Sequence, residues 1–153
     1  MFSKFKLKEV RQDFIFPYKI APYKRNKYVK VEHFKNMSKS ITVYYGTMSG
    51  NSEELAEKAQ TVLAEKGHTV EVVNLEDSKP ESLLETPYCL FIVSTWGEGE
   101  PPVDAEDFYE ALTSYEESYG AIQYGIMGLG DTDYELFNEF ARMLDKEMER
   151  LGA

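Results

Sequence analysis

The chain has 153 residues, of which 42% are hydrophobic and 29% charged, which suits one domain with a proper core and leaves too little for two. The net charge of −10 divides unevenly, because residues 1–40 carry 11 Lys and Arg against 3 Asp and Glu, whereas the remaining residues carry 6 against 24. This acidic body disfavours nucleic acid as a partner and favours basic proteins. The single cysteine, Cys89, argues against a disulfide framework or a cysteine-rich metal site and fits a reducing, cytoplasmic compartment.

No apolar run approaches the roughly 20 residues that a membrane span needs, and the N-terminus lacks the apolar core of a signal peptide. Residues 1–36 mix lysines with aromatic residues, and Pro17 and Pro22 interrupt any helix. We expect a poorly ordered basic leader, or upstream sequence translated ahead of a start at Met37, followed by one domain over 37–153. The alternative is a basic arm that contacts a membrane surface, nucleic acid or the protein's own acidic body. Tyr28–Phe34 alternates weakly and could form one strand.

A regular pattern begins at Ile41, where β-branched and apolar runs start to alternate with helical periodicity. The predicted strands are Ile41–Tyr45, His68–Leu75, Tyr88–Ser94 and Ala121–Leu129. The predicted helices are Ser52–Lys66, Asp104–Glu117 and Tyr134–Leu151. Strands that alternate with helices, without hairpin turns, predict an α/β protein whose parallel sheet is covered on both faces. Ligands of such sheets bind beyond the carboxyl ends of the strands, so the loops at those ends are the candidate site.

The first of these loops is Gly46–Ser52, here called the phosphate loop, with the sequence GTMSGNS. It offers the hydroxyls of Thr47, Ser49 and Ser52, and free backbone N–H groups at a helix start, which together suit a phosphate dianion. It lacks the GxxxxGK[ST] motif of nucleotide triphosphate sites and the GxGxxG motif of dinucleotide sites. A serine-capped helix that follows a glycine turn is the alternative interpretation.

The second loop is Thr95–Pro102, here called the tryptophan loop, and it contains the single Trp of the chain, Trp96. A Trp between a strand end and two glycines suits stacking against a planar ring system. Gly97 and Gly99 would let the backbone approach such a ring closely. The alternative is a Trp that belongs to the hydrophobic core.

The third loop is Gly128–Phe137, here called the tyrosine loop, and it offers Tyr134 as a second aromatic face beside Asp131 and Asp133. Asp133 could instead cap the final helix. The three loops together predict a site for a phosphorylated planar heterocycle. They contain no His, Cys or Lys to act as a nucleophile or base, and no defensible metal-ligand spacing, so any chemistry would come from the bound cofactor.

These three motifs, YGTMSGNSE, STWGEGEPP and GLGDTDYELFN, are similar in order and spacing to those of the flavodoxin family, which Ile41–Ala153 resembles. The family includes short-chain bacterial flavodoxins and the FMN modules of diflavin reductases such as sulfite reductase flavoprotein. The resemblance implies FMN, with its phosphate on the first loop and its ring between Trp96 and Tyr134. The implied FMN-binding residues are Thr47, Met48, Ser49, Gly50, Asn51, Ser52, Thr95, Trp96, Gly97, Glu98, Gly99, Leu129, Gly130, Asp131, Asp133, Tyr134, Phe137 and Asn138.

The resemblance also implies a doubly wound, flavodoxin-like parallel sheet of order 2-1-3-4. We expect it to be incomplete at its C-terminal end, because the family continues with a fifth strand and a last helix. The implied function is that of an FMN-binding electron carrier, which shuttles single electrons between a reductase and an acceptor with basic surfaces. The alternatives are a separated FMN domain of an NADPH-dependent diflavin reductase, and a non-redox interaction domain that has lost FMN.

Overall fold

The computed structural model describes residues 38–153, which form one four-stranded sheet and three α-helices. The strands are β1 (Ser40–Gly46), β2 (Thr69–Asn74), β3 (Tyr88–Ser94) and β4 (Gln123–Leu129). The helices are α1 (Asn51–Glu65), α2 (Glu106–Thr113) and α3 (Glu139–Arg150). The expectations for residues 1–36, including a strand at Tyr28–Phe34, lie outside the described residues.

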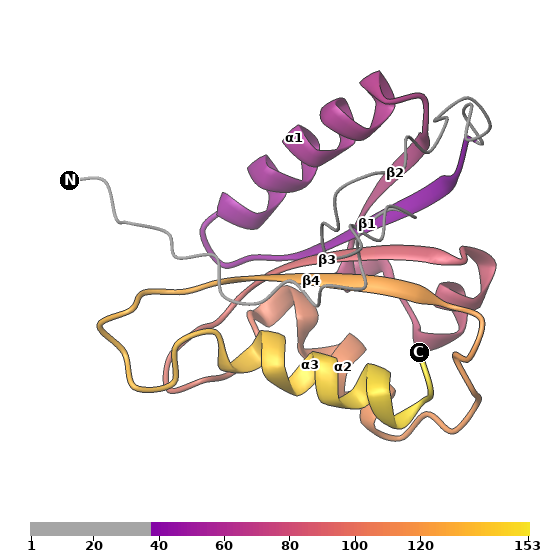
Figure 1. The fold of residues 1–153 in the computed structure, drawn as a ribbon. Coiled ribbons are helices and arrows are strands. Elements are labelled where there is room, and N and C mark those ends of the chain that lie inside the picture. The colour runs from indigo at the N-terminus through magenta and orange to yellow at the C-terminus, as the bar shows by residue number, and fades with distance from the viewer. Residues whose placement is uncertain (1–37) are drawn as a thin grey trace, which may run out of the picture.

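All strand pairs are parallel, as the sequence pattern predicts, and the strand order is β2-β1-β3-β4, as the family resemblance implies. Helix α1 covers one face of the sheet, and α2 and α3 cover the other (Figure 1). Successive residues of a strand therefore enter different cores: Val43 packs on the side of Ala56 in α1, whereas Tyr44 packs on the side of Phe108 in α2. This two-sided burial explains why the central strands read as continuous apolar runs.

The predicted bounds of two helices are wrong. Helix α3 begins at Glu139 rather than Tyr134, because Asn138 adopts a left-handed conformation (φ 58°) that a helix cannot contain. Helix α2 spans only Glu106–Thr113, and a 3₁₀ turn, η4 (Val103–Ala105), precedes it. The later start of α3 means that the last four residues of the tyrosine loop, from Tyr134 to Phe137, are not part of the helix.

The segment between β2 and β3 contains two 3₁₀ helices that the sequence pattern did not reveal, η2 (Leu75–Asp77) and η3 (Pro80–Glu85). They place Leu75 and Leu83, both fully buried, in the core on the side of α2 and α3. Short 3₁₀ segments have no lasting hydrophobic period, so the pattern gave no signal for them.

The phosphate, tryptophan and tyrosine loops follow β1, β3 and β4, which are neighbours in the sheet and run in the same direction. Their carboxyl ends meet at the left side of Figure 1, opposite the C-terminus of the chain. Within residues 38–153, no helix combines the length and apolar character that crossing a membrane requires.

Candidate functional site

The phosphate loop turns sharply from β1 into α1 through Gly50, whose φ is +81°. The hydroxyl oxygen of Thr47 accepts hydrogen bonds from the backbone N–H groups of Gly50 (2.9 Å) and Ser52 (3.4 Å). Between residues 38 and 153, the N–H groups of Met48, Ser49 and Asn51 have no acceptor. The start of α1 therefore offers free donors together with the positive end of the helix dipole, which is an arrangement that binds anions.

The side chain of Ser52 lies at this helix start and is fully buried. Its hydroxyl oxygen has no hydrogen-bond partner in the part of the chain that the structure describes. Leaving a buried polar group unpaired costs roughly 1–3 kcal/mol. A bound phosphate oxygen at this position would accept a hydrogen bond from the Ser52 hydroxyl and remove that cost.

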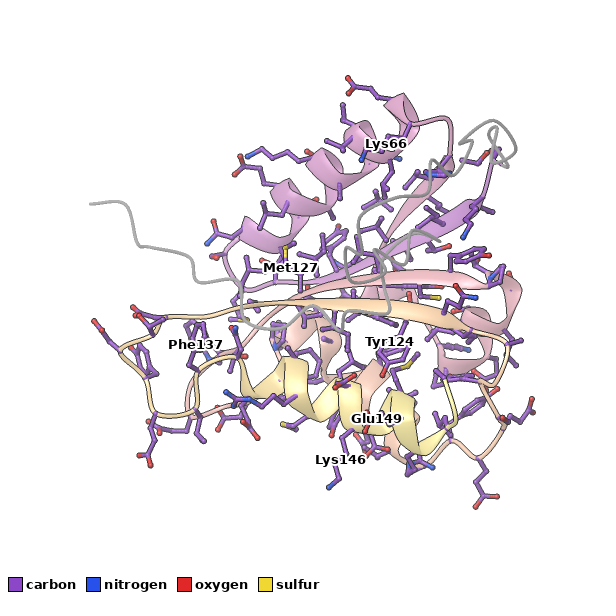
Figure 2. All side chains as sticks on the ribbon, in the orientation of Figure 1. Lys66, Tyr124, Met127, Phe137, Lys146 and Glu149 are labelled. Atoms are coloured by element: carbon purple, nitrogen blue, oxygen red, sulfur yellow. The ribbon has the colours of Figure 1, made fainter. Side chains whose placement is uncertain are left out.

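The tryptophan and tyrosine loops enclose a cavity of about 310 Å³, at the lower end of the size range of small-molecule sites. Trp96 and Tyr134 stand at its rim, with 57% and 61% of their surfaces exposed. The interpretation of Trp96 as a core residue is therefore wrong. Figure 2 shows Phe137 on the connection between β4 and α3, and it also lines the cavity.

The tryptophan loop forms a turn that is closed by backbone hydrogen bonds between its two sides. Trp96 and Glu100 exchange two backbone hydrogen bonds of 2.9 Å each. The turn requires glycine at two positions, because Gly97 and Gly99 have φ values of +50° and +114°. A Cβ atom at Gly99 would also lie 3.2 Å from the side chain of Leu136, so the tryptophan loop packs directly against the tyrosine loop.

Thr95 connects the same two loops by hydrogen bonds. Its hydroxyl oxygen accepts from the backbone N–H of Phe140 (3.2 Å) in the first turn of α3, and its own N–H donates to the carbonyl of Leu129 (2.9 Å). Asn138, which precedes α3, makes no side-chain cap. Thr95 therefore caps a helix that lies 45 residues further along the chain.

We expect Thr95→Val, which keeps the shape of the side chain and removes the acceptor, to destabilise the domain by about 1 kcal/mol. Thr95→Ser, which keeps the hydroxyl, is the matched control and should retain most of the stability. Urea unfolding at equilibrium measures both. Equal stability of the Val and Ser variants would show that the cap contributes nothing.

The tyrosine loop packs tightly around Asn138, which lines the cavity. A Cβ atom at Gly130 would lie 2.8 Å from the Asn138 side-chain oxygen. Asn138 is 8% exposed, and within the described residues its side-chain oxygen accepts no hydrogen bond. The cavity therefore has, like the phosphate loop, a buried polar atom that a ligand could satisfy.

The acidic residues of the tyrosine loop do not cap α3, which corrects the alternative interpretation of Asp133. The Asp131 carboxylate instead accepts from the backbone N–H of Asp133 (2.9 Å), which shapes the loop. Both side chains are exposed, as are Glu98 and Glu100. No cluster of His, Cys, Asp or Glu that could ligate a metal occurs among residues 38–153.

The cavity brings together part of the set that the sequence predicts. Its predicted members are Thr95, Trp96, Gly97, Gly130, Asp131, Tyr134, Phe137 and Asn138. Leu136 also lines it and was not among the predicted site residues. Glu98, Gly99, Leu129 and Asp133 do not line it. Sequence reasoning also missed Asp104, whose carboxylate contacts the phosphate loop and whose position in a predicted helix gave no signal.

Comparison with known proteins shows the family to which the chain is similar. The family model described as flavodoxin matches residues 43–153. The chain is 38% identical over 117 residues to the sulfite reductase [NADPH] flavoprotein alpha-component of Bacillus subtilis, across 76% of this chain and 19% of that protein. It is 32% identical over 132 residues to NADPH–cytochrome P450 reductase of Sus scrofa, across 80% of this chain and 19% of that protein. The chain thus spans about a fifth of the length of these curated relatives.

Solved structures match over most of their length. Oxidised flavodoxin 2 of Bacillus cereus superposes with a TM-score of 0.67 at 32% identity, across 74% of this chain and 77% of that chain. A short-chain flavodoxin associated with a non-canonical PDU bacterial microcompartment superposes with a TM-score of 0.67 at 28% identity, across 74% of this chain and 76% of that chain.

Proposed function

Because the chain belongs to the flavodoxin family, we propose that it binds FMN without a covalent bond and transfers single electrons between proteins. Membership of the family implies FMN binding and protein redox partners. FMN supplies the redox chemistry when it is bound, and the protein supplies binding, orientation and electrostatics.

The observation that carries the proposal is that each of the two parts of the site contains one buried polar atom without a hydrogen-bond partner within residues 38–153. The Ser52 hydroxyl lies at the anion-binding end of α1, and the Asn138 side-chain oxygen lies in the cavity beside it along the sheet edge. FMN carries a phosphate that accepts hydrogen bonds and a ring system with an N–H that donates one. The chemistry of the two sites therefore fits the two ends of this cofactor.

In this proposal, the phosphate is bound by the backbone N–H groups and hydroxyls of the phosphate loop. Trp96 and Tyr134 supply flat faces for the flavin ring, and both are exposed enough to be covered by it. The remaining predicted contacts with the ring are Gly97, Glu98, Gly99, Leu129, Gly130, Asp131, Asp133, Phe137 and Asn138. Because the rim is exposed, one edge of the ring would remain open to a partner protein.

Partner proteins with basic surfaces fit the electrostatics of the body, which carries 24 Asp and Glu against 6 Lys and Arg from residue 41 onward. A reductase would donate electrons and a second protein would accept them, each docking at the open edge of the ring. Salt would weaken such docking because the charges are exposed. The single, buried Cys89 is compatible with a cytoplasmic location.

A second candidate function is that of the FMN-binding part of an NADPH-dependent reductase. The identity of 38% with the Bacillus subtilis sulfite reductase flavoprotein component favours it. Residues 38–153 supply one flavin-type site, and a nicotinamide nucleotide would react on another domain or chain. Co-purification of an NADPH-dependent flavoprotein would support this candidate over a free electron carrier.

FMN reconstitution tests the proposal. Purified protein mixed with FMN should, after removal of free FMN, retain about one FMN per chain, absorb in the visible flavin bands and quench the flavin fluorescence. Reduction by a stepwise titration should then proceed in two separable one-electron stages. Protein that stays colourless under all folding conditions would contradict FMN binding and favour the non-redox alternative.

A further inference from the structure

Asp104 joins the phosphate loop to the segment that follows the tryptophan loop. Both oxygens of its carboxylate accept from the backbone N–H of Thr47, at 2.9 and 3.0 Å. Thr47 and Asp104 are 57 residues apart in sequence, so this contact depends on the tertiary structure and cannot be recognised from a local sequence pattern. Asp104 lies in η4. The same turn makes a second contact with the phosphate loop, in which the backbone N–H of Val103 donates to the sulfur of Met48 (3.4 Å).

The hydrogen bonds of the Thr47 backbone and of its hydroxyl form one chain of contacts through the loop. Asp104 fixes the Thr47 backbone, and the Thr47 hydroxyl then accepts from Gly50 and Ser52. The Thr47 N–H consequently donates to Asp104 and is not available to a bound phosphate. Within the phosphate loop, the N–H groups that remain free for an anion are those of Met48, Ser49 and Asn51.

The charge of Asp104 is unexpected beside an anion site, because a carboxylate repels a phosphate dianion. None of the ion pairs recorded between residues 38 and 153 involves it. Burial raises the pKa of its carboxyl group, the hydrogen bonds from Thr47 and Asn74 lower it, and the charge of Glu76 raises it further. The benefit of Asp104 must therefore come from the geometry of its hydrogen bonds rather than from its charge.

We propose that Asp104 is a positioning residue for the phosphate loop: its carboxylate holds the Thr47 backbone in the conformation in which the neighbouring N–H groups can bind the phosphate of FMN. This inference rests on the proposed function, since it names the residue that sets the shape of the same site. Asp104 does not itself contact the phosphate.

Two variants separate hydrogen bonding from charge. Asp104→Ala leaves the Thr47 N–H without its acceptor, and it should weaken FMN binding about tenfold, as expected when a hydrogen bond that positions the loop is lost. Asp104→Asn keeps one oxygen as an acceptor and removes the repulsive charge, so it should bind FMN at least as tightly as the unaltered chain. Fluorescence titration measures both affinities.

Riboflavin, which has the same ring and lacks the phosphate, is the matched probe. An effect on the phosphate loop should change riboflavin affinity less than about twofold in either variant, whereas a general structural defect would weaken FMN and riboflavin equally. Equal losses for the two flavins, or an Asp104→Ala variant that binds FMN as tightly as the unaltered chain, would overturn the inference.

The ligand-free protein supplies a readout that does not depend on flavin binding. Hydrogen exchange of the Thr47 amide should be slow in the unaltered chain and in Asp104→Asn, and fast in Asp104→Ala. Equally fast exchange in all three proteins would overturn the role of Asp104. Failure of the unaltered chain to bind FMN would instead overturn the proposed function, and the Thr47 amide would still decide whether Asp104 positions the loop.

Discussion

A chain that carries both Trp96→Ala and Tyr134→Ala is expected to bind FMN on the order of a hundredfold more weakly than the unaltered chain. Stacking of a heteroaromatic ring on an aromatic side chain contributes about 1–3 kcal/mol, and the two side chains stand at the rim of the same cavity. Fluorescence titration with FMN measures the loss, because stacking quenches the flavin.

The same double variant should keep its fold. More than half of the surface of each side chain is exposed, so their removal takes little apolar area out of the core. The melting temperature of the ligand-free protein should therefore change little. Val62→Ala, on the exposed face of α1, is a matched control for loss of an exposed hydrophobic side chain and should leave FMN affinity unchanged. If the double variant bound FMN with unchanged affinity, the flavin ring could not lie between these two side chains.

The second large effect is expected at Gly128, near the carboxyl end of β4. A Cβ atom there would lie 2.8 Å from the Cβ of Ala141 in α3 and 3.0 Å from Cγ of Asn138. Neither neighbour can move freely, because the Cβ of Ala141 is fixed to the helix backbone. Gly128→Ala should therefore push the start of α3 away from the sheet, destabilise the domain by about 1–3 kcal/mol, and displace Asn138 from the cavity. Urea unfolding and FMN titration measure the two consequences.

Two further variants test the cause of this effect. Gly120→Ala adds the same methyl group where the nearest side-chain atom, Oγ of Ser118, is 3.4 Å away, and it should be close to neutral. Ala141→Gly costs about 1 kcal/mol by itself because glycine disfavours a helix interior. Combined with Gly128→Ala it should restore part of the lost stability, since the nearest clashing atom is gone and only the contact with Asn138 remains. Strictly additive losses in the double variant would rule out the contact between these residues as the cause.

The local pattern of the sequence was sufficient to predict the four strands and their parallel direction. β3 is a continuous apolar run because both faces of the sheet are covered there. The strand order is the one that the resemblance to the flavodoxin family implies. The meeting of three loops at one edge also follows from sequence, because parallel strands place their carboxyl ends together. Eight of the residues that the sequence assigns to the site accordingly line one cavity.

Other features depended on contacts between distant segments. Asn138 has a left-handed backbone conformation and lies against Gly128 and Gly130, so α3 starts only after it. The hydrophobic period of the sequence continues through Asn138 and therefore indicated a longer helix. The cap that Thr95 places on α3 and the hydrogen bonds from Thr47 to Asp104 join residues 45 and 57 positions apart.

The sequence by itself determined the layered architecture and the edge of the sheet at which a ligand would bind, because hydrophobic period and strand direction are properties of short segments. Only the tertiary structure decided the shape of that site, including which N–H groups remain free in the phosphate loop and which side chains line the cavity. The physical reason is that hydrogen bonds and close packing between loops depend on positions in space, which no local spacing of residues encodes.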